Sequence, residues 1–308
     1  MQSLANAQSQ TNDVLVRGVM QEIITVSDFL AYFPFENIVG DGIRYNRESS
    51  LPTVSWRSRT GTWTEDAAVR TSHTASLYIL GGDTDVSEFD RKVYGNVQDQ
   101  VSLAIAEKAK AMARTFETDI IYGNNATNVL QPDGLHAMIT GTQSVDNSAD
   151  SGAVGTPRRL EMAFLDQMID TVLPGRPDYL MMNRTILRRL NAFYRGAGSP
   201  QPKGDDGKPL SDYGGVPILI NDHITMTEGL NAGNYAAASE SATSIFALRM
   251  GSTGLHGLQN GNGIETIELG MLHDRDAQRH RLRWYAGAAL KSTLSSASLV
   301  GITDAAPA

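Results

Sequence analysis

Residues 36–74 most limit how this chain can fold. Two stretches within them, 42–48 and 53–59, alternate apolar and polar residues and predict two β-strands. Two strands alone are at best marginally stable in water, and this pair places two of the chain's three tryptophans, Trp56 and Trp63, on a polar ribbon. The sequence therefore predicts a projection that packs on something outside its own fold.

A second constraint is a helical period that runs from Asn96 to Tyr122. Asn96 is a good N-cap, and Gly123 followed by Asn124 supplies a left-handed stop. At 1.5 Å of rise per residue, such a helix is about 40 Å long. This is longer than a compact domain of this size needs, so the sequence predicts a strut.

The remaining N-terminal residues predict an arm and short elements. Met1–Asp13 contain a single Leu and predict an arm without a core of its own. Residues 19–30 have helical spacing, although their β-branched content also permits a strand. Residues 73–80 predict a strand that ends in a turn at 81–83.

The C-terminal half predicts a small α/β domain followed by a mostly β region. The α/β elements are a helix capped by Thr156 and ended by Pro174, a strand over 178–182, a helix capped by Asn183, a loop over 196–215 and a strand over 216–220. The later strands are predicted over 244–250, 264–269 and 279–290, with the Asn-Gly steps at 260–263 as a hairpin turn between the first two.

Composition excludes several classes of protein. The net charge of −8, from 26 Lys and Arg against 34 Asp and Glu, argues against tight electrostatic binding of nucleic acid. The absence of cysteine excludes disulfides, thiolate metal sites and a cysteine nucleophile. No apolar run approaches the roughly 18 residues of a membrane span, and the polar start does not resemble a signal peptide. We therefore expect a folded cytosolic protein.

The sequence contains no spacing typical of a catalytic, phosphate-binding or metal-binding motif. The nearest histidine pair, His273 and His280, is more typical of surface histidines than of metal ligands. Asp83, Asp85 and Glu88 predict a solvated acidic turn rather than a calcium loop. We therefore expect neither an enzyme nor a bound cofactor or metal.

Two groups of charged and aromatic residues are candidates for interaction surfaces. Alternating arginines on the last long strand could contact a polyanion, or could pair with carboxylates of their own or a neighbouring subunit, which the negative net charge favours. The tryptophans of the projection stand among charges of both signs, which favours a protein–protein surface over a nucleic-acid ribbon. The candidates for inter-subunit contact are Arg44, Arg47, Trp56, Arg57, Arg59, Trp63, Glu65, Asp66, Arg279, Arg281 and Arg283.

Four segments, taken in order, resemble the major capsid proteins of tailed bacteriophages, the Hong Kong 97 type. They are the arm with the projection at 36–74; the helix end at 116–123 with Pro132-Asp133-Gly134-Leu135; the stretch from Leu180-Met181-Met182-Asn183-Arg184-Thr185 through 210–218; and Arg283-Trp284-Tyr285-Ala286-Gly287-Ala288-Ala289. Each motif alone is weak, but together they cover nearly the whole chain in the family's order.

The resemblance implies an α+β capsid fold with a long spine helix. It implies four parts: an N-terminal arm (1–35), an extended two-stranded loop (36–74), a peripheral domain (75–145 and 243–289) and an axial α/β domain (146–242 and 290–308). It also implies that the projection lies across a neighbouring subunit, which explains why it cannot stand alone.

The function implied is that of a structural subunit of an icosahedral phage head, which self-assembles into hexamers and pentamers around double-stranded DNA in the host cytoplasm and is part of the virion. An alternative is the shell protein of an encapsulin-like nanocompartment, which encloses protein cargo. A soluble hydrolase has no residue arrangement to support it. The implied partners are copies of the chain itself, a portal protein, a separately encoded scaffolding protein and an optional decoration or cementing protein, with no membrane partner.

Overall fold

The computed structural model describes residues 29–94, 100–147, 157–196, 212–229, 235, 241–261 and 263–304. The predicted arm at 1–13, the N-cap at Asn96 and most of the loop at 196–215 lie outside these residues. The helices are α2 (Phe29–Tyr32), α3 (Glu88–Tyr94), α4 (Gln100–Tyr122), α5 (Leu135–Met138), α6 (Met162–Thr171) and α7 (Arg184–Gly196), with short 3-10 turns η1 (Gly141–Gln143) and η2 (Thr293–Ser295). The strands are β1 (Phe35–Asn37), β2 (Gly42–Ser50), β3 (Val69–Ser76), β4 (Tyr78–Ser87), β5 (Ser144–Asp146), β6 (Tyr179–Met182), β7 (Asp212–Tyr213), β8 (Val216–Ile220), β9 (Thr243–Leu248), β10 (Leu255–Gln259), β11 (Glu265–Met271), β12 (Ala277–Leu290) and β13 (Ser296–Ile302).

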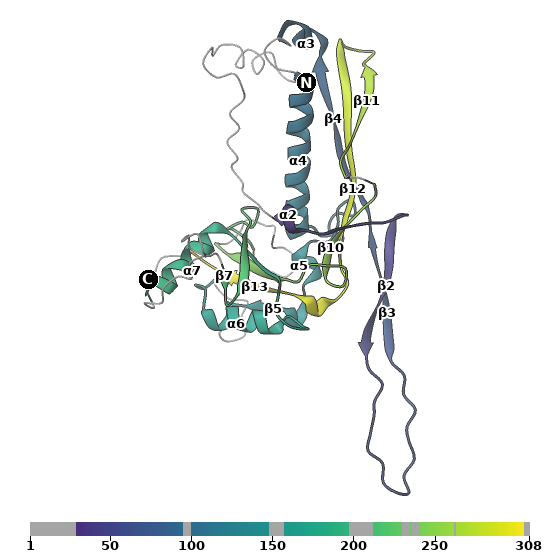
Figure 1. The fold of residues 1–308 in the computed structure, drawn as a ribbon, viewed down its shortest axis with the longest axis vertical. Coiled ribbons are helices and arrows are strands. Elements are labelled where there is room, and N and C mark those ends of the chain that lie inside the picture. Colours follow the sequence, from purple (N-terminus) through teal and green to yellow (C-terminus); the bar gives the residue numbers. More distant parts are fainter. Residues whose placement is uncertain are drawn as a thin grey trace.

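A five-stranded sheet is built around the 14-residue strand β12. β12 pairs antiparallel with β4 on one side and with β10 and β11 on the other, and β1 extends the sheet in parallel from β10. The helix α4 runs alongside this sheet (Figure 1). The alternation of β12 places Leu282 and Trp284 toward α4, where the Trp284 ring lies 4.6 Å from that of Phe116. The predicted strut and the predicted alternation are both confirmed.

The second sheet is mixed and has six strands in the order β5-β13-β9-β6-β8-β7. α6 and α7 pack against it and bury a core that includes Leu165, Met168, Leu180 and Ile186. The predicted strand at 178–182 is confirmed as β6, and Asn183 caps α7 by accepting the Thr185 backbone N–H at 2.9 Å. The predicted α/β unit therefore exists, although it completes its sheet with β9 and β13 from the C-terminal part of the chain.

The strands β2 and β3 form an isolated two-stranded hairpin that projects away from both sheets (Figure 1). The predicted strand at 53–59 is wrong: residues 51–68 contain no strand, and the partner of β2 is β3. Alternation in 53–59 was a weak signal because Thr, Ser and Arg alternate equally well in an open loop. The two-stranded projection itself is confirmed, with a longer loop at its tip.

The predicted turn at 81–83 is also wrong, because Gly81, Gly82 and Asp83 lie inside β4 and pair with β12. A Cβ on Gly81 would lie 2.5 Å from the Leu282 backbone oxygen, and one on Gly82 would lie 2.7 Å from Cε of Lys108 on α4. The two glycines therefore serve close approach of neighbouring chain segments rather than a change of direction. The carboxylates expected on a solvated turn instead lie along a strand.

Two further expectations failed because distant segments pair. The helix predicted from Thr156 begins at Met162, and Arg158 instead forms a parallel bridge to Ile302. The hairpin predicted between 244–250 and 264–269 does not form, because β10 lies between these segments and both β10 and β11 pair with β12. A local turn signal could not reveal that choice of partner.

The two sheets suggest where the chain divides. β9 is hydrogen-bonded between β13 and β6 in the six-stranded sheet. A boundary drawn at residue 243 would therefore separate β9 from its sheet, and one at 145/146 would cut β5, which pairs with β13.

Candidate assembly surfaces

The hairpin tip exposes large apolar side chains to solvent. Trp56 is 104% exposed and Trp63 63%, with Leu51 and Val54 also exposed. Residues 51–68 form no strand, and their own polar side chains make hydrogen bonds within the tip. Single exposed apolar residues are common, but four large ones within 13 residues of one projection make the tip a candidate interaction surface.

Polar contacts cross the base of the tip. The Asp66 carboxylate accepts the Thr53 backbone N–H at 2.7 Å, the Thr53 hydroxyl, and the Ala67 N–H at 2.9 Å. The hydrogen bonds from Thr53 hold the pKa of Asp66 below its usual value. Arg57 donates to the Gly61 oxygen at 2.8 Å and lies over the Trp63 ring at 5.3 Å from its centre. The tip therefore makes polar contacts within itself and covers one face of Trp63 with Arg57, while Trp56 remains uncovered.

The other predicted contact residues of the hairpin separate into two sets. Arg59 and Glu65 are exposed, and neither makes a hydrogen bond or ion pair to any residue that the structure describes. Arg44 is exposed on β2, whereas Arg47, three residues along, is half-buried and donates to the backbone oxygens of Leu290 and Lys291. Arg47 therefore acts within its own chain.

The arginine row on β12 is paired with carboxylates of its own chain. Arg279 donates to both oxygens of Asp85 at 2.7 and 2.8 Å, and Arg281 to both oxygens of Asp83 at 2.7 and 2.9 Å. These arginine hydrogen bonds hold the pKa values of Asp83 and Asp85 below their usual range. Pairing with carboxylates was favoured over polyanion binding, and the geometry places the partners in β4.

Arg283 completes the row by donating to Glu265 on β11 at 2.9 Å. The three pairs therefore cross from β12 to the strands on both of its sides, as cross-strand neighbours do. Their charges cancel on one face of the sheet, which leaves little net attraction for a polyanion.

A buried acid–imidazole network was not predicted from the sequence. It lies where the end of α4 meets the segment at 221–228: Glu228 accepts the Tyr122 hydroxyl at 2.5 Å and the Ser244 hydroxyl, and its carboxylate lies 3.6 Å from Nε2 of His136. Burial and the nearby Glu228 carboxylate raise the pKa of Tyr122, which keeps the phenol neutral. The partners are far apart in sequence, so no spacing could have indicated this network.

A second acid–imidazole pair joins α4 to the segment that follows β8. Oε2 of Glu117 is 3.1 Å from Nε2 of His223, and Thr118 shares a hydrogen bond with the other ring nitrogen of His223. His280, expected at the surface, is buried, while His273 is exposed. No group of three or more potential metal ligands occurs among the residues for which the structure gives positions. These polar groups hold α4 to the six-stranded sheet.

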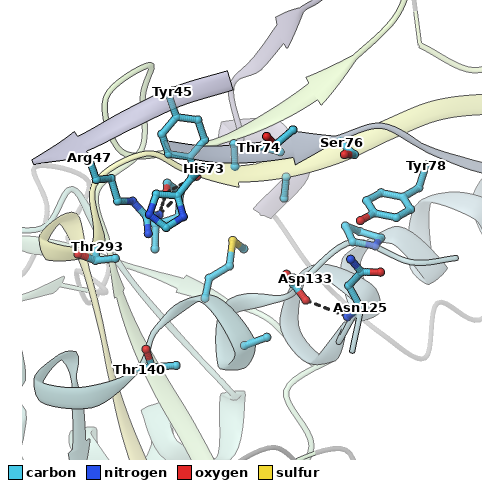
Figure 2. Close-up of a pocket in the computed structure, with 17 residues that line it drawn as sticks. Tyr45, Arg47, His73, Thr74, Ser76, Tyr78, Asn125, Asp133, Thr140 and Thr293 are labelled. Carbon is cyan, nitrogen blue, oxygen red and sulfur yellow. Dashed lines mark hydrogen bonds between the residues drawn. The ribbon is translucent and has the colours of Figure 1, made fainter. Parts of the chain in front are cut away.

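A groove of about 340 Å³ lies between the hairpin base and the segment at 125–140 (Figure 2). Tyr45, Arg47 and His73 line it from the hairpin, and Asn125 and Asp133 from the opposite side. The described lining contains no nucleophile paired with a base, so its geometry does not suggest catalysis.

Comparison with protein families now decides the class of protein. The family described as the SU10 major capsid protein matches residues 61–252, well over half of the chain. The chain belongs to the SU10 major capsid protein family. The match includes residues 61–68 of the hairpin tip, all of β3 and α4, and the segment from α6 to β9, and it ends before the last of the four segments that carry the resemblance. No curated protein matches the chain in sequence.

Solved structures share the fold across the whole chain. The SrpI encapsulin of Synechococcus elongatus is 16% identical with a TM-score of 0.71, covering 98% of this chain and 96% of that one. The capsid of Myoviridae phage XM1 is 12% identical with a TM-score of 0.65, covering 98% and 99%. Mycobacterium phage Adephagia gives 13% identity and a TM-score of 0.64 with full coverage of both chains. The fold is α+β, of the Hong Kong 97 type.

The family establishes the role of the SU10-family chain. It is the major capsid protein of a phage head, a structural component of the virion rather than an enzyme. Subunits of such shells associate with copies of themselves. No helix within the described part of the chain is long and apolar enough to cross a membrane.

Proposed function

We propose that the hairpin β2–β3 packs across a neighbouring copy in the hexamers and pentamers of the shell, with the tip at 51–68 as its main contact. The observation that carries this proposal is Trp56, which is fully exposed in the single chain although the surrounding tip is held by polar contacts. A tryptophan provides a large apolar contact area, and tryptophan is enriched among the residues that carry most of the binding energy at interfaces.

The charges of the tip favour a protein partner. Arg57 and Arg59 stand beside Glu65 and Asp66, so the tip carries no net basic charge, and the whole chain is at −8. A surface that tracks a nucleic-acid backbone needs an excess of cations. The tip therefore fits a neighbouring subunit better than it fits the packaged DNA.

Substitution of Trp56 tests the proposal. We expect Trp56→Ala to leave subunits folded, with the wild-type melting temperature, but to reduce the yield of closed shells at least tenfold in sedimentation and electron microscopy. Thr64→Ala, an exposed change in the same tip, is the matched control and should assemble normally. Normal shells from Trp56→Ala and from the double variant Trp56→Ala/Trp63→Ala would contradict the proposal.

We also propose a division into an arm, an extended loop, a peripheral domain with α4 as its spine and an axial domain. The separate sheets support it, with the boundary before β10 rather than before β9. Each arginine of the β12 row pairs with a carboxylate of its own chain. We still propose that the exposed parts of Arg279, Arg281 and Arg283 contact a neighbouring subunit.

A separately encoded scaffolding protein, a portal protein and an optional decoration protein are proposed as further partners of a shell that encloses double-stranded DNA. Expression of the chain alone should give irregular or open assemblies, and uniform closed shells without a helper would contradict this partner.

We propose that the shell is held without covalent links through the extended loop. The six lysines, Lys92, Lys108, Lys110, Lys203, Lys208 and Lys291, all lie outside 36–74. Stability must then come from many modest non-covalent interfaces. Mature particles should run as 33.3 kDa monomers in denaturing electrophoresis, and a ladder of multimers would contradict the proposal.

The shape likeness to an encapsulin supports a second candidate, a compartment that encloses protein cargo. The contents of purified particles separate the two candidates. Double-stranded DNA is expected for the phage head, and a defined protein cargo without DNA would favour the compartment.

A further inference from the structure

The hairpin is joined to the rest of the molecule through a narrow base. It enters through Gly40, whose φ of +110° is left-handed, and leaves through Leu77, whose N–H donates to the Asp41 oxygen at 2.7 Å. Beyond that base, β2 and β3 pair only with each other in the described sheets. Two strands joined at one end do not by themselves fix a direction relative to the body, so other contacts must do so.

At the base, Ile43 and Ala75 pack against a buried cluster that includes Leu258. Further along β2, two side chains add directed polar contacts. Tyr45 donates its hydroxyl to the Leu290 oxygen at 3.2 Å, and Arg47 donates from Nε to the Lys291 oxygen at 2.9 Å and from Nη2 to the Leu290 oxygen at 2.5 Å. Both acceptors lie at the end of β12, the central strand of the five-stranded sheet. The Arg47 guanidinium also lies over the Tyr45 ring, 5.5 Å from its centre.

The chemistry of these contacts requires arginine. The oxygens of Leu290, the last residue of β12, and of Lys291, just past it, both accept from one side chain, and a planar guanidinium can donate to both of them from fixed positions. A lysine ammonium is a single point with freely rotating donors, so it would hold one oxygen without fixing an angle.

The groove leaves room for the hairpin to move if these bonds are lost. Tyr45, Arg47 and His73 form one wall and the segment at 125–140 the other (Figure 2). Within the described residues, no hydrogen bond crosses the groove between β3 and this segment. Among the described residues, the polar contacts of the hairpin therefore lie at the strand end of β12 and not across the groove, while apolar packing holds its base.

We propose that Arg47 is a positioning residue that, with Tyr45, fixes the direction of the hairpin relative to the central sheet. A small change of angle at the base moves the tip, at the far end of the strands, by a much larger distance. The consequence for assembly rests on the proposed packing of the tip on a neighbour; the effect on hairpin direction does not.

The chain contains its own control. Arg44 lies on the same strand and is exposed, and it makes no hydrogen bond or ion pair with the residues described in the structure. Arg44→Ala removes the same side chain and charge from β2 as Arg47→Ala does, without removing the bonds to the end of β12.

The absence of cysteine allows hairpin direction to be measured with site-specific spin labels. Full-length subunits carrying Thr60→Cys in the tip and Ala111→Cys on α4 are kept below the assembly concentration, and the distance between the labels is measured by pulsed electron paramagnetic resonance. We expect one narrow distribution for the parent and for Arg44→Ala. Arg47→Ala and Arg47→Lys should each broaden it at least twofold, and Tyr45→Phe should broaden it less.

A narrow, parent-like distribution in folded Arg47→Lys, or equal broadening in Arg44→Ala, would overturn the proposal. If Arg47→Ala does not fold, the lysine and phenylalanine variants decide the result. Shell yield is measured separately under assembly conditions. A broadened distribution with normal shells would support the positioning role and contradict the packing of the tip on a neighbour, so the two proposals fail in different ways.

Discussion

The outer face of the five-stranded sheet and the hairpin tip look alike in sequence but differ in structure. Both contain closely spaced arginines and carboxylates, and both were predicted as contact surfaces. On the sheet, Arg279 and Arg281 each donate two hydrogen bonds to one carboxylate. In the tip, Arg59 and Glu65 have no such partner among the described residues, and Trp56 is uncovered.

The difference teaches that charge alone does not indicate an assembly surface. The sheet satisfies its charges within one chain and buries its apolar side against α4, so it stabilises the subunit. The tip uses its polar atoms to fix its own shape and leaves its apolar area exposed, which stabilises nothing in a single chain. Substitutions in the sheet should therefore change the stability of the subunit, and substitutions in the tip should change shell assembly.

The largest effect should come from a pair of tryptophan substitutions, one in each region. Trp284 is 6% exposed and contacts Phe116, so Trp284→Ala should lower the free energy of unfolding by about 3–5 kcal/mol. Trp56→Ala should change it by no more than about 0.5 kcal/mol. Chemical denaturation of unassembled subunits measures both. Equal losses for the two variants would break the comparison.

A smaller effect should come from the carboxylates of β4. The pKa values of Asp83 and Asp85 are lowered in the folded chain. Their contribution to stability is therefore complete above the unfolded-state pKa of about 4 and is lost as the pH falls through the lower folded-state values. Asp83→Asn/Asp85→Asn should lower stability at pH 7 by less than Trp284→Ala does, because solvent screens ion pairs at the surface of a sheet and forming them costs side-chain entropy.

The pH dependence sharpens this prediction. Between pH 7 and the acid range, the parent should lose more stability than the double asparagine variant, so that their unfolding free energies converge at low pH. Glu161→Gln, on a carboxylate outside the arginine row, should follow the parent curve. A gap that stays constant down to pH 2 would show that the loss comes from side-chain packing rather than from ionisation.

The sequence predicted what depends on local period and failed where distant segments choose partners. The spacing of α4 and the alternation of β12 were readable because one face of each is buried along its whole length. The predicted strand at 53–59 was wrong because an alternating segment forms a strand only beside a partner strand, and β2 pairs with β3 instead. Gly81 and Gly82 were misread as a turn because close approach to Leu282 and Lys108 is a property of tertiary packing.

The candidate contact residues show the same limit. The sequence indicated the arginines of β12 but not their partners: those of Arg279 and Arg281 lie almost 200 residues away in β4, and that of Arg283 lies on β11. The sequence indicated Trp56 correctly, because a tryptophan among polar neighbours signals an exposed apolar side chain whichever strands the segment forms. It placed Arg47 with the outward residues, although the end of β12 is within reach only once the hairpin has formed.

The smallest effect should come from Asp66, whose hydrogen bonds lie wholly within the tip. Asp66→Asn should leave the free energy of unfolding unchanged, because the side chain is exposed and joins only Thr53 and Ala67. The amide hydrogen of Thr53 should exchange several-fold faster, since the carboxylate that accepts it is replaced by a weaker acceptor. In the parent, the same acceleration should appear as the pH falls through the lowered pKa of Asp66, after correction for the intrinsic exchange rate, because protonation removes the charge that strengthens the bond.

Hydrogen-exchange measurements on unassembled subunits report both effects, with the amide of Gly61, which donates to the Ser58 oxygen, as the internal reference. A change at Gly61 equal to that at Thr53 would mean that the tip opens as one unit, and the polar contacts of Asp66 would then organise the whole presentation of Trp56 rather than one end of it.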